Sequence, residues 1–209
     1  MRPKLPSKLP TLTNAMMALV LALCCSTQSW ADSMVTAELS PAANAVKAEL
    51  ESKIQSAPRG HAAITQEGWE NAILMQQNGT SWANAYQGGI DNQLYATQSG
   101  SGNVLSSTQQ GEHNRVEAVQ TGTDNLLQTE QYGSNNLIDI EMLGNSQFAW
   151  LYQEGTGNQI SAHLAGTGNA LTVQQTGNNN LVDVNIQSSA RTIGITQHGN
   201  NLGLAINHP

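Results

Sequence analysis

The stretch "QTGTDNLLQTEQYGSNNLIDIEM", residues 120–142, nearly repeats itself after eleven residues. The motif Gln-x-Gly-x-x-Asn begins at Gln120 and begins again at Gln131. A short period of this kind is typical of stacked repeat proteins, in which each unit buries its apolar side only against its neighbours. The eleven-residue period is therefore the main indication of the fold in this sequence.

The glycine of this motif recurs with a step of eleven residues along most of the chain, and one step, between Gly79 and Gly89, is ten. The series is Gly68, Gly79, Gly89, Gly100, Gly111, Gly122, Gly133, Gly144, Gly155, Gly166, Gly177, Ser188 and Gly199. The residues three positions later are Asn71, Trp82, Asn92, Asn103, Asn114, Asn125, Asn136, Gln147, Asn158, Asn169, Asn180, Arg191 and Leu202. Asn is thus the usual occupant of that position.

Two and four residues after the Asn position the side chains are usually apolar, as at Ile138 and Ile140, and polar residues lie between them. Alternation with period two predicts a strand with one buried face. Glycine and its neighbours then predict a turn of about four residues. We expect fourteen strands, from 61–66 to 202–207, coiled two per rung into seven rungs of about 22 residues. The predicted fold is an all-β β-solenoid over residues 60–209, roughly 34 Å tall.

In-register stacking would place identical amides above one another inside the coil. One predicted column is Asn71, Asn92, Asn114, Asn136, Asn158 and Asn180. The other is Gln66, Gln87, Gln109, Gln131, Gln153, Gln175 and Gln197. We expect each amide to donate to the copy above and accept from the copy below, as in the ladders of cross-β fibres. The alternative, amides that only decorate loops, fits the turn Asn but not Gln at a strand end.

A third column is mixed. It begins as glutamine and continues with aliphatic residues: Gln77, Gln98, Gln120, Met142, Leu164 and Ile186. We therefore expect the C-terminal rungs to be more hydrophobic inside than the N-terminal rungs.

The N-terminus has the order of a secretory signal peptide: basic residues, an apolar run at 15–25 and a small-residue site before Asp32. We predict a signal peptide over residues 1–31. A membrane anchor is the alternative, but the run is about half of the roughly 20 residues that span a bilayer. A lipoprotein signal at Cys24 is disfavoured by Leu23, because that position normally holds a small residue.

Cleavage would remove both cysteines and leave fifteen acidic and five basic residues, a net charge of −10. Such a chain has no disulfide, and its charge does not suit the binding of nucleic acid or anionic lipid.

Residues 32–59 lie outside the repeat. Ser40, Pro41 and apolar residues at four-residue spacing predict a short amphipathic helix at 41–55. A tail recognised during export is the alternative.

We expect the protein to have no enzymatic activity and to bind no metal or cofactor. Catalytic carboxylates must converge on one cleft, whereas the predicted turns are short and the acidic residues lie on different rungs: Glu67, Asp91, Asp124, Asp139 and Asp183. The histidines also lack the spacing of metal ligands: His61, His113, His163, His198 and His208. The motif of calcium-binding β-rolls is absent from the sequence, and only Thr192 and Thr196 resemble the rows of ice-binding solenoids.

The pattern Gln-x-Gly-x-x-Asn over residues 60–207, with aliphatic residues two and four after the Asn, resembles the repeat of curlins, the subunits of bacterial curli fibres. The resemblance implies a functional amyloid, exported through a dedicated outer-membrane pore with accessory factors and polymerised on the cell surface with its cognate curlin. The start "HAAITQEGWENAILMQQNG", 61–79, is more similar to the minor, nucleating subunit than to the major one. A major fibre subunit and a non-amyloid solenoid adhesin are the alternatives.

Two surfaces follow from the pattern. Phe148, Trp150 and Tyr152 alternate with inward positions and predict an exposed aromatic patch, which suits a filament, a partner subunit or a glycan. A face shielded by the N-terminal helix is the alternative. Leu202, Leu204 and Ile206 form an uncharged alternating strand and predict a docking edge, since an open strand pairs with other strands.

Overall fold

The computed structural model describes residues 19–23, 32–37 and 60–209, and every regular element in these ranges is a β-strand. The predicted helix at 41–55 lies outside the described residues. The strands are β1 (Leu19–Leu23), β2 (Asp32–Ala37), β3 (His61–Trp69), β4 (Ala72–Ile90), β5 (Gln93–Glu112), β6 (Arg115–Thr123), β7 (Leu126–Ser134), β8 (Leu137–Asn145), β9 (Phe148–Thr156), β10 (Gln159–Thr167), β11 (Ala170–Asn178), β12 (Leu181–Ile186), β13 (Thr192–Asn200) and β14 (Gly203–His208).

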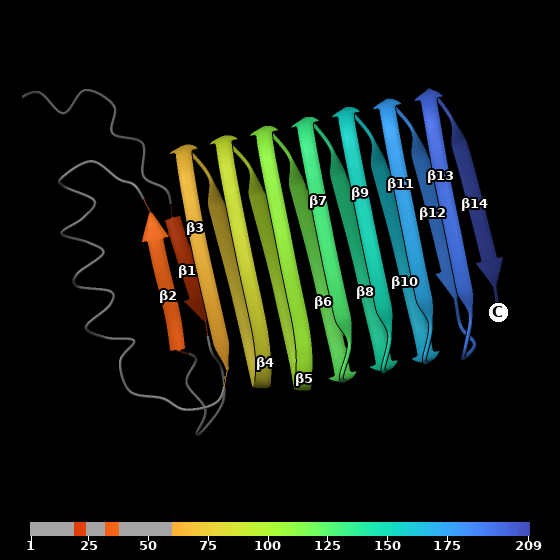
Figure 1. Cartoon of the computed structure of the whole chain (residues 1–209), viewed down its shortest axis with the longest axis horizontal. Coiled ribbons are helices and arrows are strands. Elements are labelled where there is room, and N and C mark those ends of the chain that lie inside the picture. The colour runs from red at the N-terminus through yellow and green to blue at the C-terminus, as the bar shows by residue number, and fades with distance from the viewer. Residues whose placement is uncertain (1–18, 24–31, 38–59) are drawn as a thin grey trace, which may run out of the picture.

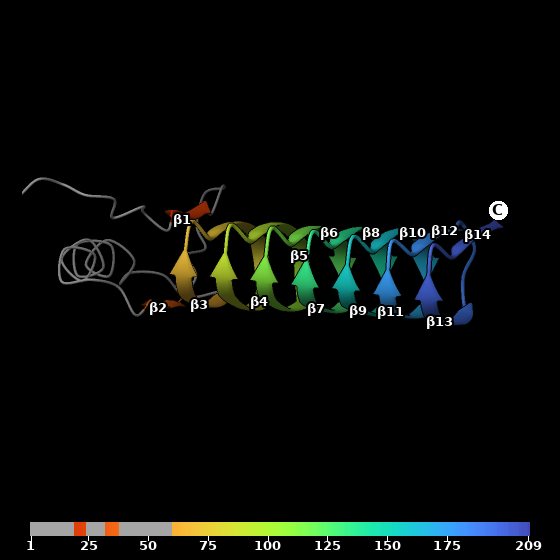
Figure 2. The same ribbon diagram turned by 90° about the horizontal axis from the view of Figure 1, so that it is seen from above.

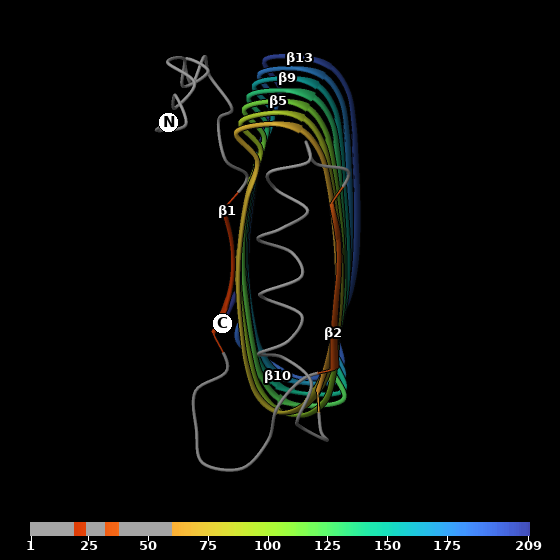
Figure 3. The ribbon, with the colours of Figure 1, turned by 90° about the vertical axis from the view of Figure 1, so that its left-hand side faces the viewer.

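The chain from β3 onward winds into a flattened coil whose rungs stack side by side, with the C-terminus at the far end (Figure 1). All strand pairs are parallel, and within the chain from β3 onward residues pair with partners 21 or 22 positions away, as Gln109 pairs with Gln131. The predicted β-solenoid with two strands per rung is confirmed. The view along the stack shows two long sides joined by tight corners (Figure 3).

We call the two long sides A and B, and they form two layers in Figure 2. Side A consists of β3, β7, β9, β11 and β13 with residues 82–90 of β4 and 104–112 of β5. Side B consists of β6, β8, β10, β12 and β14 with residues 72–80 of β4 and 93–101 of β5. Because β4 and β5 each continue around a corner, the described solenoid contains the fourteen predicted strand segments.

The core lies between the two sides and is made by alternate residues of each strand. In β8, for example, Ile138, Ile140 and Met142 are buried while the residues between them face outward. The third column changes inside as predicted, because Met142, Leu164 and Ile186 are fully buried where earlier rungs bury glutamine. Burial of such aliphatic side chains contributes about 1.5–3 kcal/mol each.

The corners are tighter than the predicted four-residue turns. Only Asp124 and Asn125 lie between β6 and β7, and Asp124 takes the left-handed conformation with φ 56°. The repeat glycine remains within the parallel ladder just before the corner. At Gly133, φ is +112° and an added Cβ would overlap the carbonyl oxygen of Gly155 on the next rung. Glycine is therefore required there both by conformation and by space.

Two irregular rungs have local causes. Where the repeat is one residue short, Ser81 and not Trp82 takes the buried Asn position, so the prediction for Trp82 was wrong. Trp82 instead begins the next segment of side A and is exposed. At Ser188, which replaces the repeat glycine, β12 ends after six residues. Serine does not adopt the strained glycine conformation readily, so the ladder stops before it.

We predict that Gly133→Ala destabilises the solenoid far more than Gly168→Ala. Both glycines have positive φ, but an added Cβ at Gly168 meets no atom within 4 Å, and Ala190 already occupies an equivalent corner with φ 56°. We expect losses of at least about 3 kcal/mol for Gly133→Ala and about 1 kcal/mol for Gly168→Ala. Urea unfolding of residues 32–209, followed by circular dichroism, measures both. Equal losses would contradict the role of the close carbonyl.

Candidate assembly interface

The long glutamine column is a continuous chain of buried hydrogen bonds. Its seven members are Gln66, Gln87, Gln109, Gln131, Gln153, Gln175 and Gln197. In the first six, Nε2 donates to the Oε1 of the next glutamine at 2.6–3.0 Å. From Gln87 onward, Nε2 also donates to a backbone carbonyl at the start of side B, at 3.0–3.3 Å. The column thus joins successive rungs and also joins the two sides.

The shorter glutamine column ends inside the protein. Gln77 donates to Gln98, which donates to Gln120, both at 2.8 Å. Gln120 has Met142 above it in the register, so its Nε2 donates to the carbonyl oxygens of Val104 and Asn125. A backbone acceptor therefore satisfies the last amide where the aliphatic residues begin.

The asparagine column runs in the opposite direction. Its members are Asn71, Asn92, Asn114, Asn136, Asn158 and Asn180. Each Oδ1 accepts the backbone N–H of the residue in the same position on the following rung, at 3.0–3.2 Å. Where the Asn side chains bond directly, the later one donates to the earlier one. The expectation that each amide donates to the copy above was correct for Gln and wrong for Asn, whose short side chain also binds the corner carbonyls.

The second set of corners is less regular. Asn103 and Asn125 each accept the backbone N–H of the rung above, and so does Asn169. Within the described residues, four buried side-chain atoms lack a hydrogen-bond partner: Gln66 Oε1, Ser81 Oγ, Gln147 Oε1 and Asn185 Oδ1. The serine and Gln147 stand where Asn is usual. Gln147 Nε2 still donates to the carbonyl oxygens of Leu143 and Gly166, so only its oxygen is left without a partner.

Gln66 Oε1 has a different cause, because Gln66 begins its column. Gln66 is 2% exposed, and the position below it in the register is held by Ala37 of β2, which has no amide. At the other end, Gln197 is 7% exposed and its Nε2 donates to the carbonyl of Leu181. An amide nitrogen has two N–H groups, and the earlier glutamines use the second one for the next glutamine. The column thus begins with an unpaired acceptor, Gln66 Oε1, and ends with an amide, that of Gln197, whose second N–H can donate to a further glutamine.

The C-terminal edge is formed by β13 and β14, each of which pairs with one described strand, β11 and β12. Of the predicted docking residues, Leu204 and Ile206 lie on β14, and Leu202 lies at the corner before it. Leu202 and Leu204 are 40% and 39% exposed, and Ile206 packs against the end of the core. The residues therefore occupy core positions of a rung with no described rung above it.

The N-terminal edge is covered by two short strands. β2 pairs with β3 from Asp32–His61 to Ala37–Gln66, and β1 pairs with the side B part of β4. β1 lies within the predicted signal peptide, so the predicted cleavage would remove it. The edge of β4 would then lose that partner while β2 stayed in the mature chain.

Continuation of the register would place the last rung of one copy below the first rung of another. On side A, Ile193 and Ile195 would meet Ala62 and Ile64, and Gln197 would meet Gln66. On side B, Leu204 and Ile206 would meet Ile73 and Met75. Apolar residues therefore face apolar residues, and the Nε2 of Gln197 faces the unpaired Oε1 of Gln66.

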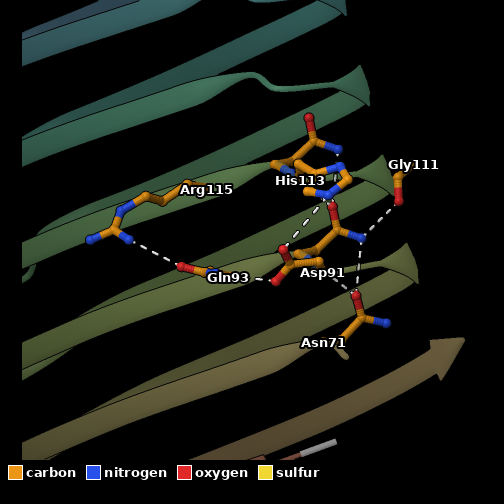
Figure 4. A network of polar contacts seen from close by, with 8 residues as sticks. Asn71, Asp91, Gln93, Gly111, His113 and Arg115 are labelled. Atoms are coloured by element: carbon orange, nitrogen blue, oxygen red, sulfur yellow. Dashed lines mark hydrogen bonds and ion pairs between the residues drawn. The ribbon is translucent and has the colours of Figure 1, made fainter. Parts of the chain in front are cut away.

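The outer surface carries local polar networks. At one corner Asp91 lies 3.7 Å from the ring of His113, and Arg115 donates to Gln93 at 3.0 Å (Figure 4). On side B, burial first and then the charges of Glu117 and Glu141 raise the pKa of Asp139, while Arg115 opposes the shift. Among the described residues, no group of three His, Cys, Asp or Glu side chains is arranged to hold a metal.

The predicted aromatic patch lies on side A. Phe148, Trp150 and Tyr152 alternate with buried residues of β9, face outward and are half-buried. Among the ranges that the structure describes, no helix has the length and apolar character needed to cross a membrane. Scans against family models, curated proteins and solved structures found no match to this chain.

We predict that replacing Gln131 and Gln153 together by Leu harms the solenoid less than replacing both by Glu. Leucine leaves neighbouring amides and carbonyls unpaired, at about 1–3 kcal/mol for each group, whereas two stacked carboxylates are like charges in a buried site. The Glu variant should recover at about pH 4, because burial raises a carboxyl pKa and the protonated group can donate. Circular dichroism against pH measures both variants. Equal strand content of the two variants at pH 7 would contradict the burial of this column.

Proposed function

We propose that this chain is a subunit of an extracellular, curli-like cross-β fibre, and that it acts as the minor subunit that nucleates the fibre. The observation that carries the proposal is the polarity of the long glutamine column. Gln66 has a buried acceptor without a partner, and Gln197 ends the column on the opposite edge. An unpaired buried amide oxygen costs free energy that a second chain can recover.

Assembly would add rungs in the register that already exists within the chain. The N–H of Gln197 would donate to Gln66 of the next copy, while Leu204 and Ile206 become buried. The backbone edges of β13 and β14 would gain parallel partners, as strand edges do in cross-β fibres. Docking at β3 requires β2 to leave that edge, since β2 pairs with it.

The corners favour a minor subunit over a major one. Leu202 has no side-chain oxygen, so the asparagine column ends at Asn180 and cannot continue into Asn71 of an identical copy. A partner whose first corner suits leucine would fit that edge better. The interior also changes along the chain, from two glutamine columns to one, so its two ends differ. If a subunit binds a different protein at one end, that end does not have to match the opposite end of an identical copy.

The remaining parts of the proposal rest on the sequence. The predicted signal peptide would deliver residues 32–209 across the inner membrane, and residues 32–59 would engage the curli export pore and its accessory factors. The cognate major curlin is the partner for polymerisation at the cell surface. Adhesion and a biofilm matrix are the roles that the curlin resemblance implies.

A monomeric solenoid adhesin is the second candidate. The observation that favours it is β2, which covers the side A half of the N-terminal edge. A covered edge does not recruit further strands. The two candidates differ in whether β2 remains in place under assembly conditions.

We predict that residues 32–209 form fibres with a meridional diffraction spacing of about 4.7–4.8 Å and bind thioflavin. The physical reason is that stacking of one chain on another pairs the backbone N–H and C=O groups of each open strand edge. Sedimentation and fibre diffraction of the purified mature chain measure this. A chain that remains monomeric for days at tens of micromolar, about the range in which such edges associate, would support the adhesin instead.

We predict further that deleting residues 187–209 leaves export intact but lengthens the lag of cognate major-subunit polymerisation severalfold, or releases the protein from the cell surface. The deletion removes β13 and β14 with their exposed apolar residues. Thioflavin kinetics with substoichiometric added protein measure the lag. A matched control replaces Asp183 by Asn, which changes an outward residue of the preceding rung and should seed normally. If the truncated chain seeds and attaches as well as the full chain, the docking edge lies elsewhere, with 61–77 the next candidate.

A further inference from the structure

A second surface lies on the broad side of the stack and takes no part in rung docking. We call it the aromatic-carboxylate patch, and it consists of Glu130, Tyr132, Phe148, Trp150, Tyr152 and Glu154. The parallel register places Glu130 beside Tyr152 and Tyr132 beside Glu154, so carboxylates and aromatic rings alternate between β7 and β9. It extends the predicted aromatic triad with three residues that the sequence pattern did not mark as a group.

Hydrogen bonds hold the patch in one arrangement. Trp150 Nε1 donates to Glu130 Oε1 at 3.3 Å, and the Tyr132 hydroxyl donates to Glu130 Oε2 at 3.4 Å. The Tyr152 hydroxyl donates to Glu154 Oε2 at 2.9 Å. The rings of Tyr132 and Tyr152 lie 5.8 Å apart between centroids and are tilted by 43°. The side chains are thus ordered before any partner arrives.

The patch carries two negative charges and no positive one. Burial and the hydrogen bond to Glu154 raise the pKa of Tyr152 to about 12, and burial with the charge of Glu130 raises that of Tyr132. The phenols therefore stay protonated and neutral near pH 7. In the described chain, the strand segments of side A contain no Lys or Arg. The hydrogen bonds orient the carboxylates but leave their charge uncompensated.

On side B, a similar pair of tyrosine and carboxylate is joined by an arginine. There the guanidinium carbon of Arg115 lies 4.8 Å from the ring centroid of Tyr95, and Arg115 pairs with Glu117 at 2.6 Å. Tyrosine, carboxylate and guanidinium together form one site across neighbouring rungs. The patch on side A has the tyrosines and carboxylates of the same group, with a tryptophan added, and lacks the cation.

We infer that the aromatic-carboxylate patch binds an arginine-bearing segment of a partner protein. The guanidinium would lie over the rings of Trp150 and Tyr152, where the ring quadrupole attracts a cation, and would pair with Glu130 or Glu154. A planar guanidinium suits both contacts better than an ammonium group. A glycan fits less well, because the ring N–H and O–H groups that would bind sugar hydroxyls already donate to carboxylates and two of the rings are tilted.

The test uses the mature protein, residues 32–209, and the fluorescence anisotropy of three labelled probes. The probes are a peptide with four arginines spaced by Gly and Ser, its lysine counterpart and a cello-oligosaccharide. We expect the arginine peptide to bind at least fivefold more tightly than the lysine peptide, with affinity falling as salt is raised. Trp150→Ala with Tyr152→Ala should weaken binding at least tenfold, and Glu130→Gln with Glu154→Gln at least threefold.

Controls separate the patch from general charge. Asp139→Asn with Glu141→Gln removes two charges from side B and should change binding less than twofold. Tyr152→Phe keeps the ring and tests the aromatic contribution if the alanine variant fails to fold, with binding expected within threefold. Equal binding of the two peptides, an equal loss in the side B variant, or binding of the sugar probe that requires Trp150 would each overturn the inference.

Discussion

The parallel register of the backbone is the constraint on which the rest of the structure depends. Because neighbouring rungs from β3 onward are joined by parallel backbone hydrogen bonds, each side chain stacks on the side chain 21 or 22 residues away. A buried polar group is then tolerable only if it can bond to a copy of itself or to a nearby carbonyl. The primary amide meets this condition because it has both donors and an acceptor, and this explains the abundance of buried Gln and Asn.

The same constraint explains how much the sequence could predict. The eleven-residue period and the alternation within each unit were enough for the solenoid, its two strands per rung and the members of both long amide columns. Contacts that depend on individual geometry were not predictable. Ser81 and not Trp82 lies in the buried position, because the repeat is one residue short at that corner. The Asn side chains donate in the opposite direction to the Gln side chains, because the short Asn side chain also binds the corner carbonyls. The contact of Trp150 with Glu130 depends on the register between β7 and β9, which a single strand does not reveal.

Stability and proposed assembly have one physical origin. Gln109 and Gln131 are satisfied by neighbours within the chain, whereas the first and last members of the column have a neighbour of their own kind on one side only. Interior bonds therefore stabilise the fold, and the same bonds, continued at the ends, would join chains. The broad sides are independent of this process, so a surface such as the aromatic-carboxylate patch would stay accessible along a fibre.

The most direct measurement is a disulfide between subunits of the fibre. Thr65 of β3 and Thr196 of β13 hold the same outward position in the register, and residues 32–209 contain no cysteine. If the columns continue between chains, mild oxidation of Thr65→Cys, Thr196→Cys fibres gives covalent multimers, and the displaced pair Ala63→Cys, Thr196→Cys gives few. Fibres that form without cross-linking of the first pair, or that cross-link both pairs equally, would contradict continuation of the register from Gln197 to Gln66.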